Sequence, residues 1–248
     1  MELAAKGLRV LVTAGGAGIG RAIAQTFVRA GARVFTCDID PKTQTDIVTD
    51  VADVRQVDEL FRQAEKKLGG LDVMVNNAGV AGPTGKVEDL RPEDWDRCIG
   101  VDLSGMFYCT RKAMPLIKAA GGGSIINLSS AAGLHGFPQR SPYCAAKWGV
   151  VGFTKSLAVE AGPDKVRVNC ICPGIVEGER IERVVDAKAK SLGVSREAFL
   201  EKFLETTSMR STVSAQEIAD MALYLASDAG RHITGQALAL DAGVRYLV

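Results

Sequence analysis

The sequence predicts a single α/β domain built on a doubly wound, seven-stranded parallel sheet with helices on both faces. Short β-branched runs alternate with longer segments of helical periodicity along the 248 residues, which is the pattern of repeated βαβ units. A glycine cluster separates the first predicted strand from the first predicted helix. The apolar fraction of 47%, with 24% charged residues, is typical of an ordinary globular core.

The predicted elements follow in order. Strands are expected over residues 8–13, 33–37, 46–49, 71–75, 124–128, 166–171 and 237–240. Helices are expected over residues 19–30, 54–68, 92–119, 142–161 and 215–227. A charged, helix-prone segment, 177–209, interrupts the alternation directly after a Pro-Gly turn. Because insertions at the carboxyl end of a strand often cover ligand sites, we predict a substrate lid there, within one domain of residues 1–248.

Composition argues against several functional classes. The formal net charge of +1 gives no electrostatic basis for binding nucleic acid or an anionic membrane. No run of 18 apolar residues and no signal-peptide pattern is present, so we expect a cytoplasmic protein. The six cysteines form no CxxC pair, and Cys170 and Cys172 have no histidine nearby. We therefore expect reduced thiols and no metal site.

The glycine-rich stretch 13–20 lies between the first strand and the first helix, where backbone N–H groups and the helix dipole favour a pyrophosphate. Asp38 ends the second predicted strand, 18 residues beyond Gly20, where a carboxylate can accept hydrogen bonds from an adenosine ribose. It would repel a 2′-phosphate, and no Arg or Lys lies in the loop or just after Asp38. These features favour NAD(H) over NADP(H). The alternative is that Asp38 only opens the following turn.

Tyr143 and Lys147 are four residues apart on a predicted helix and therefore lie on one face. The ammonium favours the phenolate, so the pair is suited to general acid/base catalysis. Ser130 follows another predicted strand, 13 residues before Tyr143, and brings a hydroxyl to the same edge of the sheet. With Ser130 donating to a carbonyl oxygen and Tyr143 exchanging the proton, hydride transfer needs no metal. The alternative for Ser130 is that it only forms a turn.

Together these residues resemble the short-chain dehydrogenase/reductase family over almost the whole chain, from Leu8 to Gly243. The TGxxxGxG pattern is met at Thr13, Gly18 and Gly20. The NNAG motif occupies residues 76–79, and YxxxK is met at Tyr143 and Lys147. A Pro-Gly turn at 173–174 and the spacing of Ser130 also match.

The resemblance implies a Rossmann-type domain with Ser130, Tyr143, Lys147 and Asp102 at the catalytic centre. It implies adenine contacts from Asp50 and Val51 and ribose contacts from Asn77, Ala78, Gly79 and Lys147. The cofactor-binding residues expected in full are Gly16, Ala17, Gly18, Ile19, Gly20, Asp38, Asp50, Val51, Asn77, Ala78, Gly79, Tyr143, Lys147, Pro173, Gly174 and Val176. The resemblance also implies a homotetramer assembled through the helix bearing the tyrosine and the long helix before it.

Three positions depart from the family pattern. Ala14 replaces a glycine, and we expect Gly15 to absorb the backbone demand. Asp102 replaces the asparagine of a proton relay; it supports the relay, or favours the charged lysine, or bonds within its own helix. Gly178 replaces a threonine that contacts the cofactor. We expect the backbone of Ile175 and Val176, or residues 177–180, to orient the nicotinamide instead.

The substrate pocket is expected between the lid and the loop 131–141. The candidate contacts are His135, Phe137, Gln139, Phe199, Phe203 and Met209, with Arg180, Arg183 and Arg196 as candidate anion-binding groups. The alternative for each is ordinary packing or a solvated helix face. A secondary alcohol is the expected substrate, either a sugar or polyol or a cyclic alcohol. A 3-oxoacyl thioester reductase and a non-catalytic NAD-binding regulator stay open as alternatives.

Overall fold

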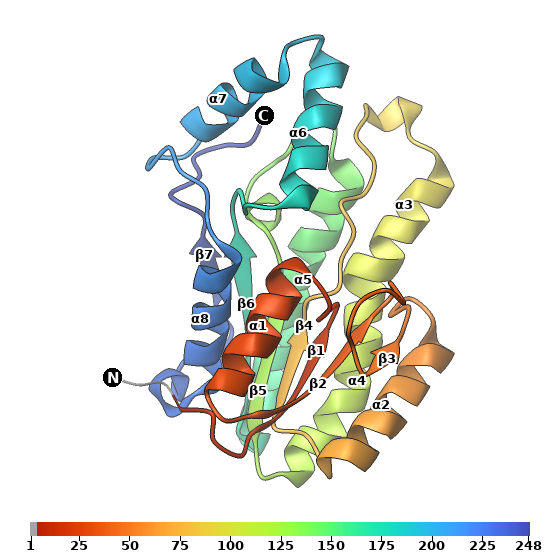
Figure 1. Cartoon of the computed structure of the whole chain (residues 1–248), viewed down its shortest axis with the longest axis vertical. Helices are drawn as coiled ribbons and strands as arrows, with labels where there is room; N and C mark the ends of the chain where they lie inside the picture. Colours follow the sequence, from red (N-terminus) through yellow and green to blue (C-terminus); the bar gives the residue numbers. More distant parts are fainter. Residues whose placement is uncertain (1–3) are drawn as a thin grey trace.

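A computed structural model describes residues 4–248 except the side chain of Arg180, and it contains one twisted parallel sheet. Within this part of the chain the seven strands run in the order β3-β2-β1-β4-β5-β6-β7, and all pairs are parallel. The order reverses between β1 and β4, which places the switch point of the doubly wound fold beside β1. The predicted fold class is therefore confirmed (Figure 1).

The elements lie close to their predicted positions. The strands are β1 (Arg9–Thr13), β2 (Arg33–Asp38), β3 (Ile47–Val48), β4 (Val73–Asn76), β5 (Gly123–Leu128), β6 (Val166–Pro173) and β7 (Ala237–Leu240). The α-helices are α1 (Gly18–Arg29), α2 (Val54–Leu68), α3 (Pro92–Ile99), α4 (Gly105–Ala119), α5 (Ser141–Ala161), α6 (Glu179–Leu192), α7 (Arg196–Glu205) and α8 (Ala215–Ala226).

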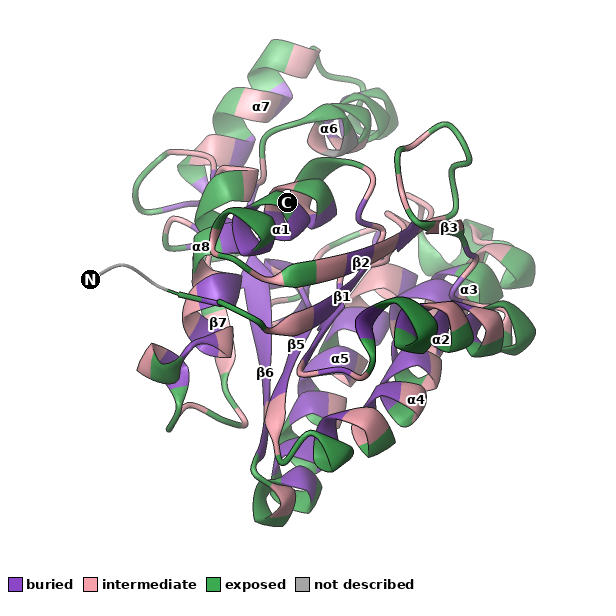
Figure 2. Cartoon of the chain, turned by 60° about the horizontal axis from the view of Figure 1, so that its bottom comes forward, coloured by how far each residue is buried: buried purple, intermediate pink, exposed green. Residues whose placement is uncertain are grey.

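Two helical layers cover the sheet because strand side chains alternate between its faces. In β1, Val10 and Val12 pack against α1 and α8 on one face. Leu11, between them, packs on the other face with Leu60 of α2 and Ala113 of α4. Figure 2 shows the buried residues on the strands and on the sheet-facing sides of these helices.

A buried polar ladder crosses the middle of the sheet. Asn76 of β4 donates from Nδ2 to Asn127 Oδ1 at 2.8 Å and to Thr110 Oγ1 at 3.0 Å. Asn127 of β5 donates in turn to Thr154 Oγ1 of α5 at 2.9 Å. Because a buried amide without a partner costs about 1–3 kcal/mol, this network fixes how α4 and α5 sit on the strands.

The single helix expected over residues 92–119 is interrupted. A π-helical segment, Gly100–Ser104, separates α3 from α4. A π-turn keeps the helical pattern of apolar residues nearly intact, so the apolar pattern of residues 92–119 does not indicate the interruption. Its position matters because Asp102 lies within it and is fully buried.

The segment 177–209 forms two helices, α6 and α7, above the carboxyl edge of the sheet (Figure 1). They share a small core with the C-terminal segment, in which Val185, Phe199 and Phe203 pack with Val244 and Leu247. An isolated bridge also pairs Thr207 with Val244. The segment is therefore a packed layer fastened to the end of the chain.

Within residues 4–248, none of the helices has the length and apolar character needed to cross a bilayer.

Candidate active site

The glycine-rich loop after β1 is held in a fixed shape by its neighbours. Asn77 donates from Nδ2 to the carbonyls of Thr13 and Ala14 at 3.0 and 3.1 Å. The hydroxyl of Thr13 accepts the backbone N–H groups of Asn77 and Ala78, both at 3.0 Å. A Cβ at Gly20 would lie 2.0 Å from the Ala14 carbonyl oxygen, so only glycine fits there. Asn77 thus braces the loop from the end of β4.

Ala14 adopts the left-handed conformation itself, with a φ of 49°. The expectation that Gly15 would absorb this demand is wrong, because Gly15 is not among the residues with positive φ. Gly15 has another constraint, since a Cβ on it would lie 2.8 Å from Thr36 Cγ2. The chain therefore stores a small amount of backbone strain at residue 14.

Ala14→Gly is expected to raise the free energy of unfolding by about 1 kcal/mol, because an L-residue at positive φ is strained and glycine is not. Urea unfolding followed by circular dichroism measures the change. Ala17→Gly is the matched control, because Ala17 has an extended backbone, with φ −147°, and gains no relief from glycine. An Ala14→Gly variant less stable than the parent would contradict the strain.

Asp38, at the end of β2, lies beside this loop. Its Oδ2 accepts the backbone N–H of Gly16 at 3.1 Å, and its Oδ1 accepts that of Asp40 at 3.1 Å. The second contact is the turn-opening role considered as the alternative for this residue, and the first binds the carboxylate to the glycine loop. The two roles coexist.

The glycine loop and Asp38 fit a dinucleotide. Gly18 has a positive φ of 50°, and nothing lies within 4 Å of the place where its Cβ would be. The loop therefore offers open backbone at the start of α1, where pyrophosphate binds favourably.

Three other residues expected to bind the cofactor, Asp50, Val51 and Gly79, follow the carboxyl ends of β3 and β4. Asp50 accepts from the Arg97 guanidinium at 2.8 Å, and Val51 is buried against Gly105. A Cβ at Gly79 would lie 3.3 Å from Lys147 Nζ. This proximity connects the chain after β4 to the expected catalytic lysine.

Lys147 is buried on α5, with only 3% of its surface exposed. Its Nζ donates to the Leu128 carbonyl at 3.1 Å and lies 3.1 Å from Asp102 Oδ2. The same nitrogen lies 5.6 Å from the centre of the Tyr143 ring, one turn away on the helix. The structure thus brings together Tyr143, Lys147 and Asp102 from two helices.

Asp102 makes its contacts outside its own helix. Oδ1 accepts the backbone N–H of Val80 at 2.7 Å. Oδ2 has no well-aligned hydrogen-bond donor among the described residues, so its contact with Lys147 is mainly coulombic. The carboxylate therefore contacts Val80 and Lys147, and neither contact is the bond within its own helix that was considered as the third role for Asp102.

The two serines after β5 have different environments. Ser129 is buried and donates from Oγ to the Lys147 carbonyl at 2.9 Å, which ties β5 to α5. Ser130 is partly exposed, and its Oγ accepts the backbone N–H of Ala132 at 3.2 Å. Since that N–H occupies one lone pair, the hydroxyl hydrogen of Ser130 can point to another acceptor.

The Pro173–Gly174 turn is closed against the last strand. A Cβ at Gly174 would lie 2.7 Å from Asp241 Cα, so glycine is required. Four residues later Gly178 has a φ of 128°. A threonine at 178 would be strained in this backbone, which is a physical reason for the departure from the family pattern.

The candidate substrate and anion contacts lie in different environments. Phe199 and Phe203 are 1% and 3% exposed and pack in the core shared with the C-terminal segment, as the packing alternative holds. Met209 is 72% exposed. Arg196 forms ion pairs with Glu182 and Asp186, as expected for a solvated helix face. The side chain of Arg180 lies outside the described residues.

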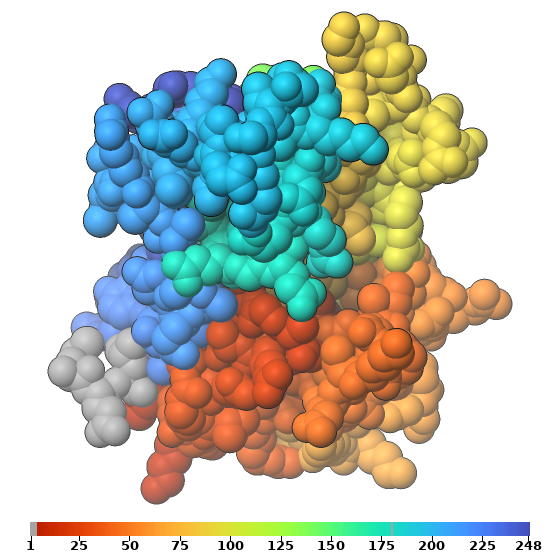
Figure 3. Space-filling model, turned by 45° about the horizontal axis from the view of Figure 1, so that its top comes forward, coloured from red at the N-terminus to blue at the C-terminus, as the bar shows by residue number. Residues whose placement is uncertain are grey.

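A cavity of about 380 Å³ lies between the chain after β4 and α6. Figure 3 shows this part of the surface, with α6 in teal beside the chain after β4 in yellow. The lining residues are Gly79, Val80, Ala81, Gly82, Thr84, Arg140, Arg183, Val184 and Ala187. Arg183, which was expected as an anion-binding residue, is among these lining residues.

Arg140 was not predicted as a site residue. It lies three residues before Tyr143, so helical spacing would have indicated a position beside the tyrosine. It is 2% exposed, and its guanidinium lies 5.2 Å from the centre of the Tyr143 ring. Lys188 was missed too, because a lysine on a charged helix is ordinarily solvated.

The fold and this edge of the sheet define a dinucleotide-binding α/β enzyme. The family described as enoyl-(acyl carrier protein) reductase matches residues 13–245. D-beta-hydroxybutyrate dehydrogenase of Rhizobium meliloti (strain 1021) is 36% identical, over 94% of this chain and 96% of that protein. The probable galactose dehydrogenase GalD of the same organism is 35% identical, over 95% and 94%. The crystal structure of levodione reductase aligns with a TM-score of 0.90 and 26% identity, over 96% and 97%.

The chain therefore belongs to the short-chain dehydrogenase/reductase family and is an oxidoreductase.

Proposed function

We propose that this protein interconverts a secondary alcohol and a ketone with NAD(H), using Tyr143 as the general acid and base. The observation that carries the proposal is the buried Lys147 ammonium, 5.6 Å from the Tyr143 ring centre, because a fixed positive charge there stabilises the phenolate. Ser130, at the end of β5, supplies a hydroxyl at the same edge of the sheet.

In the oxidative direction, the Tyr143 phenolate accepts the hydroxyl proton of the substrate. Ser130 donates a hydrogen bond to the substrate oxygen and holds it at the tyrosine. Lys147 keeps the phenolate stable and is itself held by the Leu128 carbonyl and Asp102. The nicotinamide, when bound, supplies the hydride acceptor. In the reductive direction Tyr143 returns the proton to the ketone oxygen.

The cofactor would be held by the glycine loop, with Gly16–Gly20 at the pyrophosphate and Asp38 at the adenosine ribose. The backbone after β6, at Ile175 and Val176, would orient the nicotinamide. The hydrogen bond from Gly16 N–H to Asp38 supports this arrangement, because it fixes the carboxylate next to the expected pyrophosphate site.

Asp38→Ala is expected to weaken NAD(H) binding and to relax discrimination against NADP(H). Since a carboxylate hydrogen bond contributes about 1.5–3 kcal/mol, the Kd for NADH should rise about 10- to 100-fold. Fluorescence titration with NADH and NADPH measures both affinities. Asp40→Ala, two residues away, is the control, since the Asp40 carboxylate accepts the backbone N–H of Lys42 in the following turn. A wild-type preference for NADPH would refute the assignment.

Two alternatives differ from this proposal in what they turn over. A 3-oxoacyl thioester reductase would reduce an acetoacetyl thioester in preference to free ketones. A non-catalytic regulator would bind NAD(H) and oxidise no alcohol. The buried Lys147 favours the catalytic proposal over the regulator. Burying an ammonium costs folding free energy, and a protein without catalytic activity would gain nothing from that cost.

The homotetramer and the cytoplasmic location also stay predictions. Exposed apolar side chains on α4 and α5 support assembly through these helices, since Phe107 is 47% exposed, Trp148 52% and Val159 80%.

A further inference from the structure

The cavity beneath α6 borders the proposed reacting group. A Cβ at Gly82 would lie 3.8 Å from Tyr143 Cβ, and one at Gly79 would lie 3.3 Å from Lys147 Nζ. Residues 79–82 therefore line the cavity and also lie close to Tyr143 and Lys147. Arg140 also lines the cavity and lies 5.2 Å from the centre of the Tyr143 ring, so a ligand bound at Arg140 would lie near Tyr143.

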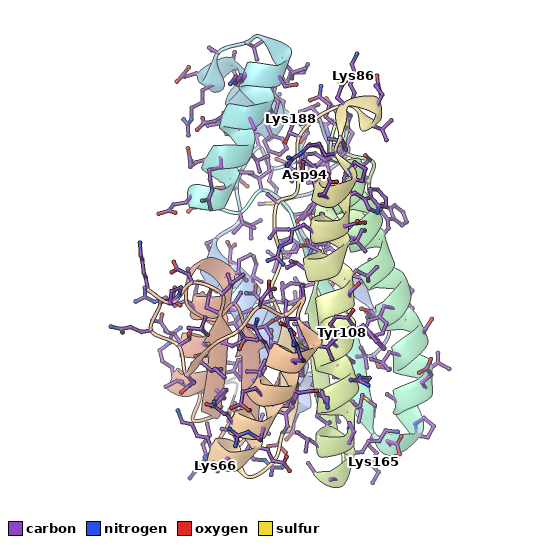
Figure 4. The ribbon with its side chains drawn as sticks, turned by 90° about the vertical axis from the view of Figure 1, so that its right-hand side faces the viewer. Lys66, Lys86, Asp94, Tyr108, Lys165 and Lys188 are labelled. Carbon is purple, nitrogen blue, oxygen red and sulfur yellow. The ribbon has the colours of Figure 1, made fainter. Side chains whose placement is uncertain are left out.

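Two buried cations lie at this cavity. Arg140 lines it, and Lys188, which is 1% exposed, directly follows the lining residue Ala187 on α6. Figure 4 places Lys188 on the side of α6 that faces the chain following β4. Both cations contact one ring, because the Arg140 guanidinium lies 5.2 Å and Lys188 Nζ 4.8 Å from the centre of Phe137. Two positive charges are thus brought together out of water.

Burial and mutual repulsion both oppose the charged forms of these two neighbouring cations, and a bound anion would offset both effects. Burial, and then the charge of Arg140, lower the pKa of Lys188 to about 8. Lys188 donates to the Pro138 carbonyl at 2.8 Å, and no carboxylate among the described residues lies within ion-pair distance of it. Arg183 adds a third cationic side chain to the lining.

The position of Arg140 is fixed by backbone contacts. Its guanidinium donates to the Ala81 carbonyl, on the opposite wall. The loop before it is joined to that wall by the hydrogen bond from Gly85 N–H to the Gln139 carbonyl at 3.0 Å. The guanidinium is therefore held in place before any ligand binds, which lowers the entropic cost of binding.

We propose that this cavity binds a carboxylate of the substrate, with Arg140 as its anchor and Lys188 and Arg183 adding positive potential. A guanidinium presents two parallel N–H donors that match a carboxylate. This proposal rests on the proposed function for the alcohol or ketone group of the substrate. The substrate class is then a small hydroxy acid and the corresponding oxo acid. Because Arg140 contacts the ring of Tyr143, the carboxylate and the reacting carbon are separated by only a few bonds.

The test is calorimetric titration of the whole protein, with and without NAD⁺, using three carboxylates and their uncharged amides: butyrate and butyramide, cyclohexanecarboxylate and its amide, benzoate and benzamide. At least one carboxylate should bind about 10- to 100-fold more tightly than its amide, as expected for a charge-assisted hydrogen bond. Arg140→Gln should remove this preference, and Arg140→Lys should keep part of it. Arg62→Gln, on exposed α2, is the matched control and should keep all of it.

Thermal unfolding checks that each variant folds. If Arg140→Gln does not fold, Lys188→Met gives the same test, with a severalfold loss of the preference expected. The proposal is overturned if no pair shows a carboxylate preference, if Arg140→Gln keeps it, or if inorganic phosphate binds more tightly than every carboxylate.

Turnover separates this inference from the proposed function. A carboxylate preference without oxidation of any alcohol would leave the anion site and remove the proposed reaction. Oxidation of neutral alcohols with the same kcat/KM as hydroxy acids would leave the reaction and remove the anion site.

Discussion

Tyr143→Phe should abolish the interconversion of secondary alcohols and ketones while leaving NADH binding within about twofold. The substitution removes one oxygen and keeps the ring that contacts Arg140 and Lys147. Because general acid/base catalysis contributes about 10²- to 10⁴-fold, kcat should fall by at least that factor. The measurement is NADH formation with a panel of secondary alcohols, together with NADH titration by fluorescence.

Tyr108→Phe is the matched control, since Tyr108 lies on α4, packs against the hydrophobic core and is not among the residues expected at the catalytic centre. Its variant should keep full activity. Turnover retained by Tyr143→Phe would remove the tyrosine from the mechanism. Binding of NADH by a wild-type protein that oxidises nothing in the panel would favour a regulator.

Asp102→Leu should lower the free energy of unfolding by about 3–5 kcal/mol, because it leaves the Lys147 ammonium buried without its counter-charge. The leucine also leaves the Val80 N–H without its acceptor. Asp102→Asn should cost less, since an amide oxygen can still accept from Val80. Urea unfolding of the apoprotein at pH 7 measures both variants.

A double-mutant cycle sharpens this test. Asp102→Asn combined with Lys147→Met removes both charges. The free energy of unfolding of this double variant should therefore fall by less than the sum of the losses of the two single variants. Asp58→Asn is the control, because Asp58 and Lys112 form an ion pair that is largely exposed and should matter little. A loss for Asp102→Leu no larger than that for Asp58→Asn would show that the buried ion pair does not stabilise the fold.

Much of the sheet was predictable because its pattern is local. Each buried strand is a short apolar run bounded by turn residues, and β7 and α2 begin and end where the sequence predicted. The π-helical segment was not predictable from the apolar pattern, and the contacts of Asp102 within it are tertiary, to Lys147 and the Val80 N–H. Similarly, only the structure shows that Ala14, not Gly15, takes the left-handed backbone.

The site was predictable where spacing along one element decides proximity, as for Tyr143 and Lys147 on α5. It was not predictable where separate segments meet. Arg183 was named with two other arginines, and only packing distinguishes the cavity-lining Arg183 from the solvated Arg196. Lys188 is distinguished from other helix lysines by Phe137 and Pro138, which lie about fifty residues earlier in the chain.

The core that α6 and α7 share with Val244 and Leu247 has a mechanical consequence. A movement of α6 that admits substrate would also affect α7 and the C-terminal residues, because all three share this core. Phe199 and Phe203 would either move together with the last residues of the chain or lose their packing. Shortening the tail by a few residues should therefore loosen the entrance to the cavity while leaving the parallel strands intact.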